Sequence, residues 1–126
     1  MAGQFHLEQG AFDRALNGRA VVAATDAATA LTAAQSIASV ITMTPTAGRA
    51  VTTATGPEII AALDEYRVGS TFEVTVVNLA PATHAITFTA NATGVTVSGS
   101  GTVAAASSAT FLGRVASATT VVYYRK

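Results

Sequence analysis

The sequence predicts an all-β fold, a compact sandwich or flattened barrel with one short α-helix and an N-terminal arm. The β-branched residues Thr, Val and Ile make up nearly a third of the chain, and such side chains suit a pleated sheet. After residue 69, apolar and polar residues alternate in several short runs, which is the period of a half-buried strand. Turns rich in Gly and Asn separate these runs at intervals of about 8–12 residues, as in sandwiches and barrels.

The first 19 residues differ in composition from the rest of the chain. Charged residues and glycines separate the four large apolar residues Phe5, Leu7, Phe12 and Leu16. A frayed chain end is one interpretation, because termini are often loose. The two phenylalanines favour the other, an arm that docks on a neighbouring molecule. We therefore expect an arm over 1–19 and a β domain over 20–126.

The segment from residue 25 to residue 39 carries conflicting signals. Its alanines favour a helix, whereas its β-branched residues favour a strand. Thr32 and Gln35 have the spacing of a capping box, which predicts a short helical turn. From residue 37 to residue 44, large apolar residues occupy both alternating sets. We expect a strand here that is covered on both faces.

A short helix is predicted over residues 57–66. Pro57 stands at the first helical position, where its missing N–H is not needed. Glu58 follows it near the positive end of the helix dipole. Ile59, Ile60, Leu63 and Tyr66 would then share one face.

The remaining chain reads as strands and turns. Phe72, Val74 and Val76 share one face of the first strand, while Thr71, Glu73 and Thr75 share the other. Turns are expected at 78–81, at 91–94 and at 99–101, and later strands at 109–115 and 120–125. The expected core contains Val51, Ile59, Leu63, Phe72, Val74, Val76, Ile86, Phe88, Val95, Val97, Phe111 and Val121.

Charge is scarce in this chain. Charged residues make up 11% of it, against about 25% in an ordinary soluble domain. Seven basic and seven acidic residues cancel, so no global field favours nucleic acid or an anionic membrane. A domain of this size leaves about a third of its surface exposed, and large neutral patches usually mark contact surfaces. We expect a homo-oligomer.

No arrangement of residues indicates catalysis. His6 and His84 are the only histidines, and cysteine is absent. Ser107 and Ser108 lack the glycine pattern of a nucleophile elbow. Glu73 has no second carboxylate nearby in sequence for acid–base work, and no spacing suggests a metal site. We expect no enzyme activity, no metal and no cofactor.

Several motifs resemble those of small virion proteins of tailed bacteriophages, of the capsid decoration (cement) or head-fibre type. The resemblance covers about three quarters of the chain and rests on residues 31–36, 48–52, 57–63, 68–74, 76–78, 94–99, Phe111 and 117–121. It implies a compact β fold that forms a homotrimer and lies on the outer capsid surface.

The resulting hypothesis is a capsid decoration or cement protein that binds the outside of a phage head and stabilises it. Its expected partners are further copies of itself and the major capsid protein, with no nucleic acid and no membrane. In the arm, large apolar groups would fill pockets of the partner, while arginines would pair with acidic groups of the shell or a neighbouring subunit. The candidate residues are Phe5, Leu7, Phe12, Arg14, Leu16 and Arg19.

Two other functions compete with this hypothesis. A fibre or spike module that contacts a host surface or glycan would need exposed aromatic residues, and Tyr123 and Tyr124 form the only aromatic cluster at hand. A bacterial cell-surface β module is the other. The first eight residues lack the basic start and apolar core of a secretory signal, which counts against it.

Overall fold

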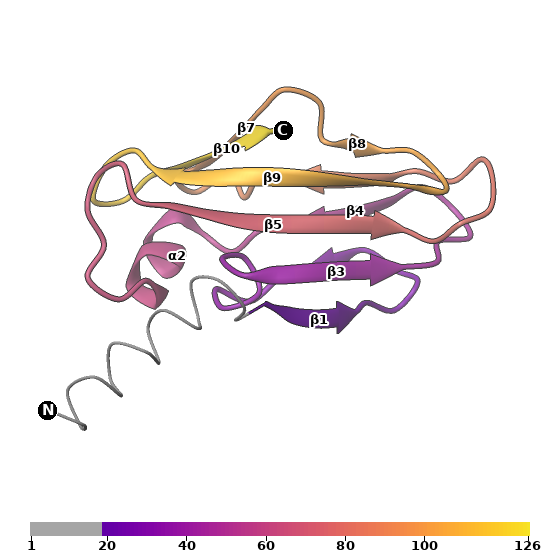
Figure 1. Cartoon of the computed structure of the whole chain (residues 1–126), viewed down its shortest axis with the longest axis horizontal. Helices are drawn as coiled ribbons and strands as arrows, with labels where there is room; N and C mark the ends of the chain where they lie inside the picture. The colour runs from indigo at the N-terminus through magenta and orange to yellow at the C-terminus, as the bar shows by residue number, and fades with distance from the viewer. Residues whose placement is uncertain (1–18) are drawn as a thin grey trace, which may run out of the picture.

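The computed structural model describes residues 19–126, which form two β-sheets packed face to face with one short helix at an end (Figure 1). The all-β sandwich prediction is confirmed. Residues 1–18, most of the predicted arm, lie outside the described residues. The six-stranded sheet contains, in spatial order, β1 (Ala20–Ala23), β3 (Ser39–Met43), β5 (Thr71–Asn78), β9 (Ser107–Val115), β10 (Val121–Arg125) and β7 (Val95–Ser98). The four-stranded sheet contains β2 (Thr29–Ala30), β4 (Arg49–Thr52), β6 (Ile86–Thr89) and β8 (Thr102–Val103).

The chain alternates between the two sheets through its first half. Strands β1, β3 and β5 are parallel neighbours in one sheet, and β2, β4 and β6 are parallel neighbours in the other. A parallel pair needs a crossover connection, and here each crossover contains a strand of the opposite sheet. Strand β9 then pairs antiparallel with β5 and with β10, and β7 pairs parallel with β10 at the far edge. The local pattern predicted the strands but not this parallel pairing.

The strands form because their apolar residues recur at every second position. In β5, Val74, Val76 and Asn78 are buried, whereas Thr71 is exposed and Glu73 is half-buried. Strand β9 shows the same alternation over nine residues. Each strand therefore gives one face to the core between the sheets and the other to the outside.

Three aromatic side chains fill the centre of the core. Phe88 of the four-stranded sheet stacks on Phe111 of the six-stranded sheet, with ring centroids 4.3 Å apart. The Tyr123 ring meets Phe88 edge-on at 5.1 Å. Its hydroxyl donates a hydrogen bond to the Ser36 carbonyl, and burial raises the pKa of Tyr123. Pairs of this geometry stabilise a core beyond the area that they bury.

Most of the predicted core is buried as expected. Leu63, Phe72 and Val97 are partly buried and pack against the margin of the core, and the other predicted members are buried. The core also contains several buried residues from strands, the helix and a turn that the prediction omitted. These are Leu31, Ile41, Met43, Ile60, Val103, Val115 and Tyr123.

The helix α2 is shorter than predicted and begins one residue earlier, spanning Gly56–Ala62. Thr55 is its N-cap and forms a reciprocal capping box with Glu58, a partner that the dipole argument did not identify. Gly56 is required because a Cβ there would lie 2.3 Å from the Thr119 carbonyl oxygen. Leu63 is already extended, so Tyr66 lies beyond the helix and is 39% exposed.

The segment before β3 is a turn, as the capping-box spacing predicted. The Thr32 N–H donates to Gln35 Oε1, and the Gln35 N–H donates to Thr32 Oγ1. Strand β3 follows, but the expected burial of both faces is wrong for the single chain. Its inward residues are buried, whereas Val40 and Thr42 on the outward side are half-exposed.

Buried polar groups are paired throughout the described residues, where no buried side-chain nitrogen or oxygen lacks a partner. Asn78, which was expected to begin a turn, is instead the buried last residue of β5. Its Nδ2 donates to the carbonyls of His84 and Val103, and its Oδ1 accepts from the Ala80 N–H. This amide therefore links the end of β5 to the neighbouring sheet.

Asp26 joins the β1–β2 connection to the β3–β4 connection. Its carboxylate accepts hydrogen bonds from the Thr46 hydroxyl at 2.5 Å and the Thr46 N–H at 3.1 Å, and pairs with Arg49 Nε at 2.8 Å. These contacts lower the pKa of Asp26 from 3.8 to about 2. The hydrogen bond from the Thr46 hydroxyl is the largest cause, and the bond from Arg49 is the next.

Replacement of Tyr123 by Phe tests the hydroxyl bond in the core. Tyr123→Phe leaves the buried Ser36 carbonyl without its donor, so we expect the free energy of unfolding to fall by about 1–3 kcal/mol. Urea denaturation measures this change. The matched control is Tyr66→Phe, at a tyrosine outside the core that is 39% exposed, for which we expect a change within about 0.5 kcal/mol. Equal effects of the two replacements would contradict the assignment.

The pH dependence of stability tests the Asp26 contacts. Because the folded-state pKa of Asp26 lies below its ordinary value, its stabilising contribution is present above about pH 4 and is lost as pH falls towards about 2. We expect Asp26→Asn to lower the thermal midpoint of unfolding at about pH 5. Near pH 2, the thermal midpoints of the variant and the parent should converge. Glu65→Gln serves as a control for a general loss of acidic charge. A constant difference across this pH range would exclude the ionised Asp26 as the cause.

Candidate functional site

The outward surface of the six-stranded sheet is the broadest continuous feature of the described residues. We call it the six-stranded face. Pairing registers place its side chains in rows that cross the sheet, such as Val40, Thr75 and Thr110 on β3, β5 and β9. Its large apolar members are Val21, Val40, Val77, Leu112, Val122 and Tyr124.

The outward surface of the four-stranded sheet differs in size and chemistry. Its strands are two to four residues long. Its outward side chains are small or hydroxylated, and no large apolar side chain is among them: Ala50, Thr52, Thr87, Thr89 and Thr102. Large apolar groups on the outside of the sandwich strands therefore gather on the six-stranded face.

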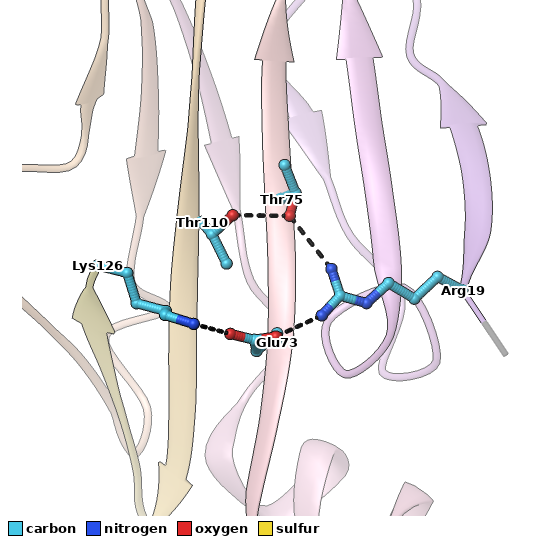
Figure 2. Close-up of polar contacts among 5 residues, drawn as sticks. All are labelled: Arg19, Glu73, Thr75, Thr110 and Lys126. Carbon is cyan, nitrogen blue, oxygen red and sulfur yellow. Dashed lines mark hydrogen bonds and ion pairs between the residues drawn. The ribbon is translucent and has the colours of Figure 1, made fainter. Parts of the chain in front are cut away.

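Glu73 joins the two ends of the described chain across the six-stranded face (Figure 2). Its Oε1 lies 2.6 Å from Arg19 Nη2, and its Oε2 lies 2.7 Å from Lys126 Nζ. Arg19 also donates from Nη1 to Thr75 Oγ1 at 3.3 Å, and the hydroxyls of Thr75 and Thr110 lie 3.0 Å apart. Arg19 reaches across β3 from the start of β1, so its side chain lies along the sheet.

This network keeps Glu73 ionised at neutral pH. The hydrogen bond from Lys126 is the main cause that lowers the pKa of Glu73, and the bond from Arg19 adds to it, while partial burial acts in the opposite direction. Arg114 is the other charged residue whose side chain points outward on this sheet. The sequence from 74 to 113 contains no Asp, Glu, Lys or Arg, so the middle of the face is uncharged.

Two shallow cavities border the face. One, of about 280 Å³, lies between Arg19, Ile37 and the beginning of β5. The other, of about 370 Å³, lies at the opposite end of β5, against Leu79, Pro81 and Ala106. The charged groups of the first cavity, Arg19 and Glu73, already bind each other. Neither cavity gathers the convergent polar groups of a small-molecule site.

Of the predicted arm residues, Arg19 alone lies within the described residues. It binds Glu73 and Thr75 of its own chain, where a shell or a neighbouring subunit was expected. Phe5, Leu7, Phe12, Arg14 and Leu16 lie outside the described residues. The sequence showed Glu73 on the threonine side of its strand, but its partners are 54 and 53 residues away and depend on strand order.

The aromatic pair considered for a host-contact module is split between two sides of a sheet. Tyr123 is fully buried in the core, and Tyr124 is 41% exposed on the six-stranded face. Adjacent strand residues point to opposite faces, so the two rings form no common surface. Of this pair, Tyr124 alone is accessible from outside.

Metal-ligating clusters and membrane-spanning helices are both absent from the described residues. In residues 19–126 there is no group of three or more His, Cys, Asp or Glu side chains that could hold a metal ion. Within the same range, no helix is both long and apolar enough to span a bilayer. Comparison of the chain with protein-family models, with curated proteins and with solved structures gave no match.

Removal of the Glu73 charge tests the network. Because exposed ion pairs contribute little, we expect Glu73→Gln to lower the free energy of unfolding by less than about 1 kcal/mol. The loss should shrink in about 1 M salt, where surface charges are screened. Urea denaturation at low and high salt measures both effects, with Glu65→Gln as the control. A salt-independent loss, or one as large as that of Glu65→Gln, would argue against these ion pairs.

Proposed function

We propose that this chain is a structural virion protein, a capsid decoration or cement protein that binds the outer surface of a tailed-phage head. The resemblance of its motifs to such proteins supports the viral role. The observation that carries a structural role is the six-stranded face, a broad surface on a small domain that presents large apolar side chains and is uncharged in its middle. Surfaces of this kind usually contact other proteins.

In this proposal the arm is the anchor on the major capsid protein. An extended arm of about 18 residues reaches roughly 60 Å, which is enough to cross onto an adjacent capsid subunit. It joins the sandwich at Arg19, whose guanidinium is held by Glu73 and Thr75. These bonds fix the starting point of the arm at the edge of the six-stranded sheet.

Homo-oligomerisation would strengthen the attachment. The resemblance implies a trimer, which would bring three arms to the shell together. Linked binding sites act at a high effective concentration, so modest individual affinities give tight overall binding. Phe5, Leu7, Phe12 and Leu16 supply the apolar anchors in this scheme, and Arg14 can orient the arm on acidic groups. Bridging several capsid subunits in this way would stabilise the head.

A fibre or spike module is the second candidate, favoured by the same family resemblance. Its contact with a host surface or glycan would rely on Tyr124, since Tyr123 is buried. The number of copies per particle separates the two functions. A decoration protein covers the whole shell, whereas a fibre tip is present in few copies.

Deletion of residues 1–18 tests the arm while retaining Arg19 and its bonds. Purified parent and truncated chains are incubated with heads of the source virus that lack this protein, and bound protein is measured by co-sedimentation. We expect the parent to bind and the truncated chain to lose at least about tenfold in affinity, because the apolar anchors dominate the interface. Circular dichroism and solution mass check that the truncated chain remains folded and assembled.

A full-length variant serves as a second test. Phe5→Ala combined with Phe12→Ala should weaken binding as the deletion does, whereas Thr87→Ala, on the opposite sheet, should not. If the truncated chain decorates heads as well as the parent, the arm is not the anchor. If the parent itself does not bind the heads, the decoration function is wrong.

A further inference from the structure

We propose that the six-stranded face is the surface on which another copy of this chain packs. The inference rests on the homo-oligomerisation in the proposed function and is independent of the viral role. It does not use the subunit number, because two copies that pack by the same face form a two-fold pair. The occupant is a second copy because two such faces together supply the area of a specific interface, and the ion pairs of Arg19 and Lys126 with Glu73 need no countercharge from a partner.

The composition of the face fits a protein–protein interface. Interface cores are enriched in aromatic residues and depleted in Lys, Glu and Asp. Here Tyr124 is accompanied by valines and Leu112, and Val21 is 69% exposed at the edge. The opposite sheet presents threonines and alanines instead. The two outer surfaces therefore differ in their large apolar side chains, which lie on the six-stranded face together with the charged groups Arg19, Glu73, Arg114 and Lys126.

Three of the four charged groups on the face are paired within their own chain, so contact with another copy need not separate them. Arg19 and Lys126 both bind Glu73. Leaving one member of a buried ion pair without its partner is strongly destabilising. Because each of these three groups keeps its partner within its own chain, another copy can cover them without supplying a countercharge. Arg114 points outward near the beginning of β5.

The area of the face is sufficient for a stable assembly. A strand residue covers about 16 Å² of a sheet, given about 3.3 Å of rise and about 4.8 Å between strands. The 35 strand residues of the six-stranded sheet therefore cover about 550 Å². Two such contact surfaces give about 1,100 Å², above the roughly 1,000 Å² that a specific interface requires. The 12 strand residues of the other sheet cover about 190 Å², too little on their own.

Single cysteines can report on the two faces because the chain has none of its own. Ser108→Cys places a thiol on the six-stranded face beside Val77, and Thr87→Cys places one on the four-stranded sheet. Both positions are exposed in the single chain. The rate of reaction with a small water-soluble thiol reagent is measured for each full-length variant over a range of protein concentrations. Rates in urea correct for intrinsic reactivity.

We expect the Ser108→Cys thiol to react at least about tenfold more slowly than the Thr87→Cys thiol at tens of micromolar. Dilution should remove this difference as copies dissociate. Addition of Tyr124→Lys to Ser108→Cys should also remove it at constant concentration, because a charge is introduced into the contact. Addition of Thr89→Lys, on the opposite sheet, should leave the protection unchanged.

Three outcomes would overturn the inference. They are equal rates at every concentration, protection of Thr87→Cys in place of Ser108→Cys, and protection that neither dilution nor Tyr124→Lys relieves. Binding of heads by the parent is measured separately, so a chain that decorates heads but leaves Ser108→Cys unprotected would refute the interface and not the decoration function.

Discussion

The packing of Phe88, Phe111 and Tyr123 between the two sheets is the interaction on which the rest of the structure depends. The stack of Phe88 on Phe111 joins the sheets directly, and the Tyr123 hydroxyl joins β10 to the turn before β3. Once these rings are buried, the two-residue period of each strand determines which side chains point outward. The core therefore determines the composition of both outer faces.

The outer faces connect the fold to the proposed function. Successive strands alternate between sheets, so three parallel strands from distant parts of the sequence lie side by side in the six-stranded sheet. Strands β9, β10 and β7 extend that sheet to six. The result is a wide surface on which Glu73 binds both ends of the described chain (Figure 2). A small domain thereby presents a wide outer surface, and Arg19 is held at its edge by Glu73 and Thr75.

Local sequence patterns predicted the elements better than their arrangement. The alternation in β5 and β9, the helix near Pro57 and the turn at Thr32–Gln35 follow from short-range rules, and the structure has all of them. Parallel pairing, the burial of Tyr123 and the Glu73–Lys126 contact depend on strand order, which local periodicity does not encode. The helix ends early because Leu63 adopts an extended conformation, a tertiary effect. Of the candidate arm residues, Arg19 alone lies within the described residues, and it binds Glu73 of its own chain through a contact that depends on strand order.

The central claim is that another copy of the chain covers the six-stranded face. The solution mass of the unmodified full-length chain tests this claim most directly. Sedimentation equilibrium at concentrations from about one to about one hundred micromolar gives this mass without reference to shape. The account predicts a defined multiple of 12.6 kDa that persists at micromolar concentration. A mass of 12.6 kDa over the whole range would contradict it.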